Sequence, residues 1–256
     1  MKEFFEKLIS EWWGIAVIVV VALAVWVLLS ALLYRPFFKR FYDIVLSGLA
    51  LIVLSPILLI LTVLGAIKMK GNPFFTQMRS GKGGKVFRLI KFRTMTCEKD
   101  ENGELLPDEK RLTKYGKILR ATSLDELPEL INIFIGNMSI IGPRPLLKKD
   151  ILFLQGEEVD RLSIRPGLSG LAQVNGRNNL SWKNKFQLDI KYVKKYSLFF
   201  DIAIIFKTIG NLFFATGVEY GGSDAEMDYG EWLLLTEKIS ESAYRETMNR
   251  LLCDEK

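Results

Sequence analysis

The sequence predicts a mainly helical α+β protein that is anchored in a membrane, and three observations support this prediction. Residues 12–34 carry no charge, and a helix of that length crosses a hydrocarbon core of about 30 Å. Residues 41–67 form a second apolar stretch that is interrupted only by Asp43. Alternating side chains at residues 86–92 predict a strand, whereas most of the segments that follow have helical spacing.

Composition excludes several classes of protein. The chain has 256 residues, of which 49% are hydrophobic, so intrinsic disorder of the whole chain is excluded. It contains no histidine, which excludes Ser-His-Asp and Cys-His nucleophile systems and histidine-ligated zinc. Cys97 and Cys253 each stand alone. They predict neither a disulfide framework nor a CxxC site, and a reducing cytoplasmic setting fits best.

The first apolar stretch is predicted to be an uncleaved transmembrane helix. It runs directly into Arg35 without the small-residue cleavage site of a secretory signal. Arg35, Lys39 and Arg40 follow it, whereas the segment before it mixes two lysines with three glutamates. Because cytoplasmic flanks are enriched in Lys and Arg, we expect residue 35 onward in the cytoplasm and the amino terminus outside.

The second apolar stretch has basic residues at both ends, at 39–40 before it and at Lys68 and Lys70 after it. Both ends are therefore expected in the cytoplasm. Ser55 and Pro56 predict a membrane break near the centre, because proline removes a backbone hydrogen bond and clashes with the preceding turn. A helix hairpin that enters and leaves on one side satisfies both flanks. An ordinary kinked span is the alternative on these residues alone.

Turn residues and apolar spacing predict the remaining elements. Gly81, Gly83 and Gly84 mark a turn between residues 74–76 and the strand at 86–92. Helices are predicted at residues 108–119, 124–134, 189–196 and 201–214. The last of these suits an interfacial helix that lies on a membrane, and a core-facing helix has the same spacing. Beyond residue 222 the chain is acidic and predicted to be helical.

Charge is distributed unevenly along the chain. Residues 68–217 carry 26 Lys and Arg against 15 Asp and Glu, whereas residues 218–256 carry 4 against 10. A basic middle predicts an anionic partner, which is a phosphorylated substrate, an acidic membrane surface or nucleic acid. Nucleic acid is disfavoured because the aromatic residues lie in apolar runs and are not interleaved with the basic ones.

The segment from Ser123 to Pro128 contains two adjacent acids, Asp125 and Glu126. Ser123 and Glu126 have the spacing of a capping box, which would begin a helix whatever the function. In the other interpretation, Asp125 stands at a helix start that favours anionic groups and acts as a nucleophile. Neighbouring residues point about 100° apart around a helix. The two acids are therefore expected to have different roles, one attacking and the other holding a metal.

Basic residues flank these acids in the sequence. Arginine between glycines and prolines is held on a stiff loop, where it makes a planar, two-pronged donor for phosphate. Arg144, Arg165 and Arg177 stand in such surroundings. The candidate phosphate-binding residues are Lys91, Arg93, Arg120, Arg144 and Arg177. Each one singly has an ordinary interpretation as a surface charge, but several together beside two acids predict a phosphate site.

The order of these motifs resembles one family, the bacterial monotopic phosphoglycosyl transferases that initiate glycan assembly on polyprenyl phosphate. The resemblance covers about residues 35–217. It rests on Lys39-Arg40, Ser55-Pro56, Phe75-Thr76-Gln77 with Arg79 and Gly81, Lys91-Phe92-Arg93-Thr94-Met95, Ser123 to Pro128, Gly136 to Ser139, Gly142-Pro143-Arg144-Pro145, Arg165-Pro166-Gly167, and Gln173 to Arg177.

The resemblance implies transfer of a phospho-sugar from a UDP-sugar to undecaprenyl phosphate, with release of UMP and with Mg²⁺ as cofactor. Asp125 would be the covalent nucleophile, and Glu126 would be the metal ligand. Basic family positions fall on Lys91, Arg120, Arg144 and Arg177. Asp201 also matches a family acid, although a cap for the following helix explains it equally well.

The family also implies a membrane arrangement, with a re-entrant helix hairpin and interfacial amphipathic helices. The expected parts are an N-terminal transmembrane anchor (1–38), a re-entrant hairpin (39–70), a catalytic domain on the cytoplasmic face of the bacterial inner membrane (71–217) and an acidic C-terminal tail (218–256). The expected partners are the UDP-sugar, undecaprenyl phosphate and the bilayer, with no nucleic acid. The extra helix at residues 12–34 is a possible homodimer contact.

Two other functions are compatible with parts of the sequence. A basic adaptor that binds anionic lipid explains the charge but gives no reason for acids among the arginines. A glycosyl transferase without a covalent intermediate releases UDP, whereas the expected enzyme releases UMP. The identity of the sugar and the glycan pathway have no signature in these motifs.

Overall fold

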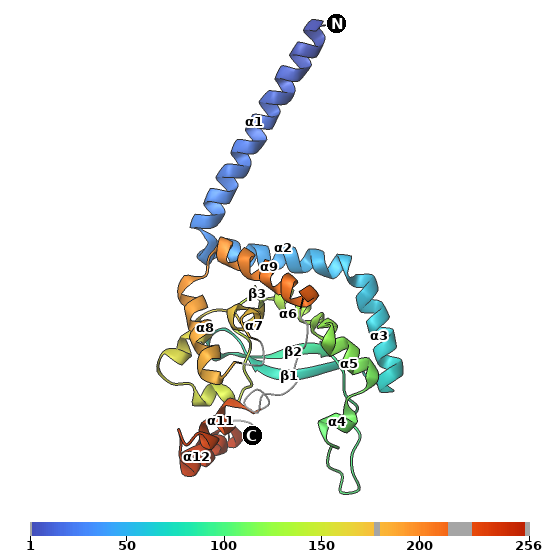
Figure 1. Cartoon of the computed structure of the whole chain (residues 1–256), viewed down its shortest axis with the longest axis vertical. Helices are drawn as coiled ribbons and strands as arrows, with labels where there is room; N and C mark the ends of the chain where they lie inside the picture. The colour runs from blue at the N-terminus through green and yellow to red at the C-terminus, as the bar shows by residue number, and fades with distance from the viewer. Residues whose placement is uncertain (1, 177–179, 215–226, 254–256) are drawn as a thin grey trace.

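The computed structural model describes residues 2–176, 180–214 and 227–253. Figure 1 shows one long helix, α1, projecting from a body in which helices surround a β-hairpin. The elements up to the hairpin are α1 (Lys2–Leu32), the π-turn η1 (Tyr34–Phe38), α2 (Lys39–Val53), α3 (Ser55–Met69), β1 (Phe74–Ser80), the turn η2 (Lys82–Gly84) and β2 (Val86–Phe92). The architecture is mostly helical α+β, as the sequence predicts.

The rest of the described chain is built from short elements and three longer helices. In order, they are α4 (Asp108–Arg111), α5 (Lys114–Ala121), η3 (Leu124–Glu126), α6 (Glu129–Ile135), β3 (Ser139–Ile141), η4 (Asp150–Phe153), η5 (Gly156–Ser163), β4 (Gly167–Ser169), α7 (Leu171–Val174), α8 (Trp182–Lys195), α9 (Leu198–Phe214), α11 (Tyr229–Leu235) and α12 (Glu241–Cys253). Strands β3 and β4 pair in parallel.

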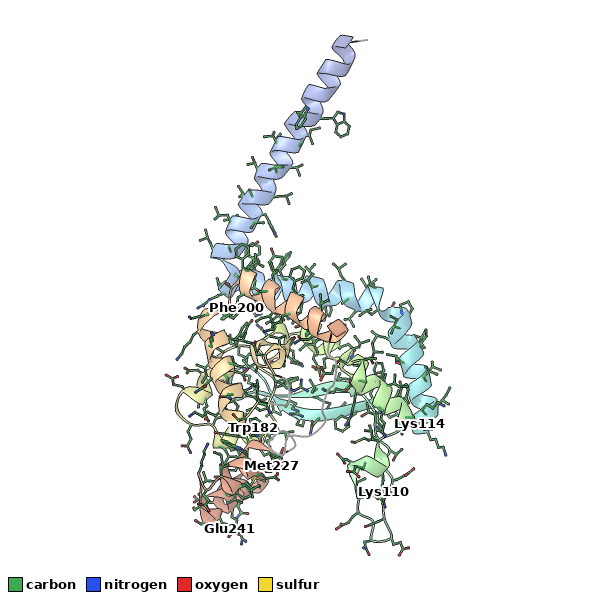
Figure 2. The ribbon with its side chains drawn as sticks, in the orientation of Figure 1. Lys110, Lys114, Trp182, Phe200, Met227 and Glu241 are labelled. Carbon is green, nitrogen blue, oxygen red and sulfur yellow. The ribbon has the colours of Figure 1, made fainter. Side chains whose placement is uncertain are left out.

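Helix α1 has the length and composition of a membrane span. Residues Trp12–Leu32 have a mean hydropathy of 3.0, and only 6% of this stretch is buried in the protein. Its side chains extend into open space on every side in Figure 2, as lipid-facing side chains would. At its foot, the Tyr42 hydroxyl lies 2.8 Å from Ser30 Oγ and accepts from Trp26 Nε1 at 3.1 Å. These contacts join the span to α2.

The predicted break at Ser55 and Pro56 is confirmed. Helices η1–α2 and α3 are bent by 64° at this point. Pro56 has no N–H to donate to the carbonyl of Ile52, and the Ser55 hydroxyl donates to that carbonyl at 2.7 Å. The carbonyl of Ile52 therefore accepts from the Ser55 hydroxyl and from a backbone N–H at the end of α2 in place of the missing donor.

Helix α6 lies between the hairpin and α2. Strands β1 and β2 pair antiparallel, from Phe74 opposite Phe92 to Ser80 opposite Val86, and their turn has positive φ at Gly83 and Gly84, as the glycines predict. The core between these elements contains Phe87, Leu89, Leu130, Ile133 and Met138, with Ala50 and Leu51 of α2 packed against it.

Two predicted helices are each interrupted. The segment 108–119 divides into α4 and α5 because Thr113 has extended backbone and its hydroxyl accepts from the Gly116 N–H, which starts a new helix. The segment 124–134 divides into η3 and α6. Pro128 cannot donate to the carbonyl of Leu124, and that carbonyl accepts instead from Leu127 three residues on.

Two other predicted helices begin earlier than expected. Helix α8 begins at Trp182, where the Ser181 hydroxyl accepts from the Asn184 N–H, and α9 begins at Leu198. Phe199, Phe206 and Ile209 of α9 are exposed, whereas Ile204 is buried. The helix therefore presents one apolar face to the core and another to its surroundings.

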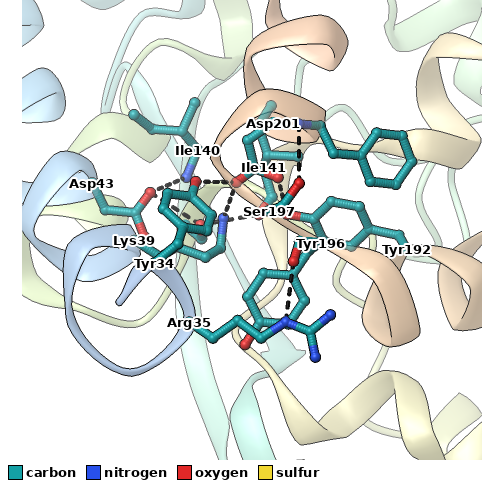
Figure 3. Close-up of polar contacts among 12 residues, drawn as sticks. Tyr34, Arg35, Lys39, Asp43, Ile140, Ile141, Tyr192, Tyr196, Ser197 and Asp201 are labelled. Carbon is teal, nitrogen blue, oxygen red and sulfur yellow. Dashed lines mark hydrogen bonds and ion pairs between the residues drawn. The ribbon is translucent and has the colours of Figure 1, made fainter. Parts of the chain in front are cut away.

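The interpretation of Asp201 as a helix cap is wrong. Ser197 precedes α9, and its hydroxyl accepts from the Phe200 N–H. Asp201 is buried at 4% exposure and accepts hydrogen bonds from Tyr34 at 2.5 Å, Lys39 Nζ at 2.6 Å and Tyr192 at 2.7 Å (Figure 3). The carboxylate therefore joins η1 and the start of α2 to α8 and α9.

A second buried carboxylate, Asp43 on α2, also joins that helix to the body. Asp43 accepts from the Ser139 hydroxyl at 3.0 Å and from the Ile140 N–H at 2.9 Å. One turn of α2 therefore carries two polar connections into the body, one from Lys39 to Asp201 and one from Asp43 to Ile140 of β3. Figure 3 labels these four residues.

The described part of the acidic C-terminal tail is helical, as predicted, and it packs on the body. Tyr229, Trp232 and Leu233 are buried with Leu146, Phe153, Leu154 and Phe186. In Figure 1, α11 and α12 lie at the end of the body away from α1.

We expect Asp201→Ala to destabilise the fold by about 3–5 kcal/mol, because it leaves the ammonium of Lys39 without its counter-charge at a largely buried position. Thermal unfolding in detergent measures the loss. Glu157→Ala is the control, since its pair with Lys194 is exposed at 74% and 53% and should contribute about 0–1 kcal/mol. Equal melting temperatures for the two variants would contradict the role assigned to Asp201.

Candidate active site

The turn that carries the two adjacent acids is not a capping box. Ser123 has a φ of 55°, in the left-handed region, and its side chain makes no capping hydrogen bond. Non-glycine residues are held in that region at a cost of about 1–3 kcal/mol, and such positions concentrate at functional sites. The left-handed backbone at Ser123 is therefore not explained by a role in starting a helix.

Glu126 lies between two cations. Its Oε1 atom is 2.7 Å from Lys91 Nζ and 3.1 Å from Arg144 Nη2. Burial alone would raise the pKa of this carboxyl, but Arg144 and Lys91 lower the pKa to about 2. Glu126 is therefore ionised at neutral pH. Lys91 from β2 and Arg144 from the loop after β3 therefore meet at this acid.

Glu129 is a third acid at this site, and it belongs to none of the motifs named from the sequence. It lies three residues after Glu126, at the start of α6, is 4% exposed and pairs with Lys91 Nζ at 3.1 Å. Burial raises the pKa of Glu129 to about 7, against the opposing effect of Lys91. The spacing from Glu126 was a usable signal, because residues three apart share a helix face.

Asp125 is half-buried next to Glu126. Burial and the charge of Glu126 raise the pKa of Asp125, while Lys91 and Arg120 act to lower it. Arg120 itself donates to the Thr94 hydroxyl at 3.1 Å. Neighbouring carboxyls with pKa values shifted in opposite directions are typical of sites in which two acids have different roles.

A small pocket opens beside these acids. Its lining comes from β1, β2, α6, β4 and the loop after β3. The lining residues are Arg79, Leu89, Lys91, Glu129, Arg144, Pro145 and Gly167. Arg79 donates to the neutral acceptors Gln77 Oε1, at 2.7 Å, and Pro145 O, at 3.2 Å. Burial and the nearby charge of Arg144 lower the pKa of Arg79. An added anion would therefore be attracted between these two arginines.

For two of the basic residues named from the sequence, no hydrogen bond or ion pair to the acids is among the described contacts. Arg93 donates to the carbonyl of Phe74 at 3.5 Å, and Arg165 donates to that of Gly136 at 2.8 Å. Arg177 lies outside the described residues.

The described residues contain no group of three or more Asp, Glu or Cys side chains arranged to hold a metal ion. Mg²⁺ in enzymes is commonly bound by one or two carboxylates together with phosphate oxygens of the substrate. Both ion pairs described for Glu126 are made to its Oε1 atom, so neither of them uses Oε2. The donor set therefore fits an ion that arrives with a phosphorylated ligand.

Comparison with known proteins identifies the family. The model of the family described as bacterial sugar transferase matches residues 34–215. The chain belongs to this family. The match begins at η1, directly after α1, and ends at residue 215, so the elements from η1 to α9 and the candidate active site lie inside it, whereas α1 lies outside.

Relatives with named functions support membership of a transferase family. The chain is 42% identical over 181 residues to "uncharacterized sugar transferase EpsL" of Bacillus subtilis, covering 71% of this chain and 90% of that protein. It is 35% identical to a UDP-glucose:undecaprenyl-phosphate glucose-1-phosphate transferase of Caulobacter vibrioides, covering 68% and 69%. A Klebsiella pneumoniae protein of the same name is 37% identical, and the match covers 67% of this chain and 39% of that protein.

The raised pKa of Glu129 predicts a dependence of stability on pH. The folded protein retains this proton between about pH 4.5 and 7, where the unfolded chain has lost it, so the free energy of unfolding falls as pH rises through that window. Glu129→Gln should remove this part of the dependence. Melting temperatures at pH 5, 6, 7 and 8 measure the effect, with exposed Glu157→Gln as the control. Parallel curves for wild type and Glu129→Gln would contradict the assignment.

Proposed function

We propose that the protein transfers a sugar phosphate from a UDP-sugar to undecaprenyl phosphate and releases UMP, as the first membrane step of a glycan pathway. The single observation that supports this most strongly is the meeting of Asp125, Glu126, Lys91 and Arg144 at one turn beside a pocket. Relatives named for UDP-glucose and undecaprenyl phosphate support a UDP-sugar as the donor and a polyprenyl phosphate as the acceptor.

The proposed reaction has two steps at one phosphorus atom. In the first, a carboxylate oxygen of Asp125 forms a bond to the phosphorus that bears the sugar, and the bond from that phosphorus to UMP breaks. In the second, a phosphate oxygen of the lipid attacks the same phosphorus and Asp125 is released. Neither step needs a histidine, in agreement with the composition of the chain.

The cations of the site have separate proposed roles. Arg144 and Arg79 bind the diphosphate of the donor, because both line the pocket and diphosphate is a bidentate acceptor for guanidinium. Lys91 contacts both Glu126 and Glu129 and keeps the two side chains side by side. Glu126 would hold Mg²⁺, which when bound would reduce the negative charge of the diphosphate. Arg120 acts on Asp125 by keeping a positive charge near it.

The proposed membrane arrangement is a span followed by a re-entrant hairpin. Helix α1 crosses the bilayer, and α2 and α3 enter and leave it on the cytoplasmic side, with the catalytic domain on that face of the inner membrane. The 64° bend and the basic flanks on both sides support the hairpin. The bend is compatible with a kinked span as well, so topology requires its own experiment.

Cysteine labelling tests the topology. In a background with Cys97 and Cys253 replaced by serine, single cysteines at residue 37 and residue 71 should both react only when a membrane-impermeant maleimide has access to the cytoplasmic face. A single cysteine at residue 11, before the span, is the control for the opposite face. Labelling of residues 37 and 71 from opposite sides would establish a kinked span.

The covalent step predicts a burst. Purified protein mixed with UDP-glucose or UDP-galactose, without lipid, should release about one UMP per active site and gain the mass of the phospho-sugar. Asp125→Asn should abolish both signals, and Glu126→Gln should lower turnover at least tenfold while the protein stays folded. Asp108→Asn, at an exposed helix start away from the pocket, is the matched control. Release of UDP in place of UMP, or an adduct on Asp125→Asn, would exclude this mechanism.

A further inference from the structure

The C-terminal segment, defined here as residues 227–253, lies beyond the part of the chain that the family model matches. Figure 2 labels its Met227 and Glu241 at the end of the body, near Trp182 of α8. It is described as two helices, α11 and α12. The segment therefore consists of residues that lie outside the family match but pack on the body that carries the site.

The segment is packed closely on the body. Tyr229 and Trp232 are buried at 4% and 8% exposure, and the Tyr229 ring meets the Phe186 ring edge to face at 4.8 Å. At Gly230, an added Cβ would lie 2.5 Å from the ring of Phe153. A glycine at a contact this close is what allows α11 to pack directly against the aromatic ring.

Polar contacts join the segment to one loop in particular. The Tyr229 N–H donates to the Asp150 carboxylate at 3.0 Å, and Asp228 forms an ion pair with Lys149. Glu231 approaches the same lysine at 3.9 Å. Lys149 and Asp150 end the Arg144 loop, defined here as residues 142–150.

The body holds the other end of the same loop. The Arg161 guanidinium, paired with buried Asp189 at 2.7 Å, donates to the backbone carbonyl of Arg144 at 2.8 Å. Arg79 donates to the carbonyl of Pro145. Leu146, in the middle of the loop, is buried in the same apolar cluster as Trp232. Strand β1 also contacts Leu146 through Ser80 and Leu147 through Arg79. The body therefore holds the loop at residues 144–147, and the C-terminal segment contacts it at Leu146, Lys149 and Asp150.

We propose that the C-terminal segment is a clamp that positions Arg144 for the diphosphate of the donor. The proposal rests on the proposed function and assigns to Asp228, Tyr229 and Gly230 a positioning role that the family match does not include. Asp125 and Glu126 have no described contact with the segment, so releasing the clamp should weaken donor binding more than it slows the chemistry at saturating donor.

Two variants release the clamp by different means, Gly230→Val by steric conflict with Phe153 and Asp228→Lys by repulsion from Lys149. Glu241→Lys is the control, because it makes the same charge reversal in the same segment at an exposed pair with Arg245. We expect both release variants to raise the KM for UDP-glucose or UDP-galactose about tenfold with kcat changed less than threefold, the effect of one lost charge-assisted contact. The control should match wild type.

Hydrogen exchange of the backbone amides at residues 146–149 supplies a readout that does not depend on turnover. It should accelerate in both release variants and remain unchanged in Glu241→Lys. Adding Lys149→Asp to Asp228→Lys restores opposite charges and should recover both slow exchange and low KM in part, because Glu231 opposes the new aspartate. A merely structural role would lower the melting temperature without this recovery of KM.

Failure of the clamp and failure of the proposed function give different results. If wild type releases no UMP from any UDP-sugar, the proposed function is wrong, and binding of UDP measured by calorimetry then takes the place of KM. If the release variants fold and keep wild-type exchange at residues 146–149, or if exchange accelerates while donor KM and UDP affinity stay unchanged, the clamp is wrong whatever the reaction proves to be.

Discussion

The buried carboxylate of Asp201 is the constraint on which the arrangement of η1, α2, α8 and α9 depends. A carboxylate at 4% exposure is stable only where opposite charge and hydrogen bonds replace its hydration, and Tyr34, Lys39 and Tyr192 supply both. Lys39 stands 162 residues before Asp201 in the chain. The carboxylate therefore fixes the start of α2 against α8 and α9, and Asp43, four residues after Lys39, fixes the same helix to β3.

The position of the acids follows from the position of α2. Arg40 donates to the carbonyls of Ile133 and Phe134 at the end of α6, where the unpaired carbonyls and the helix dipole favour a cation. The other end of α6 carries Glu129, and the turn with Asp125 and Glu126 directly precedes it. A helix that is held at both ends keeps these acids at a fixed distance from Lys91 and Arg144, which is the condition for preorganised binding of a charged ligand.

The sequence predicted the features that depend on local chemistry. The helix break at Ser55 and Pro56 and the glycine turn of the hairpin are confirmed. The phosphate site stays a prediction, and two of its basic residues, Lys91 and Arg144, pair with Glu126. The predictions of a capping box and of Asp201 as a cap were wrong, because both depend on backbone geometry that residue spacing does not determine. Ser123 has a positive φ and makes no capping hydrogen bond. Helix α9 begins before Asp201, and the Ser197 hydroxyl accepts from the Phe200 N–H at its start. Glu129 and Arg79 were missed as site residues because only the packing of α6 on the hairpin brings them to one pocket.

The uneven charge of the chain also has a structural explanation. In the described part of the acidic tail, Asp228 and Glu231 approach Lys149, and no ion pair from the tail to Lys91, Arg79 or Arg144 is among those described. Lys91 and Arg144 pair with the acids of the site, and Arg79 contacts neutral oxygens. The tail therefore places its carboxylates at the end of the Arg144 loop, and the charge of Asp228 also acts to raise the pKa of Arg79 in the pocket. Because Coulomb attraction weakens with distance, the pairing of Asp228 with Lys149 leaves Lys91 and Arg144 to pair with the acids of the site.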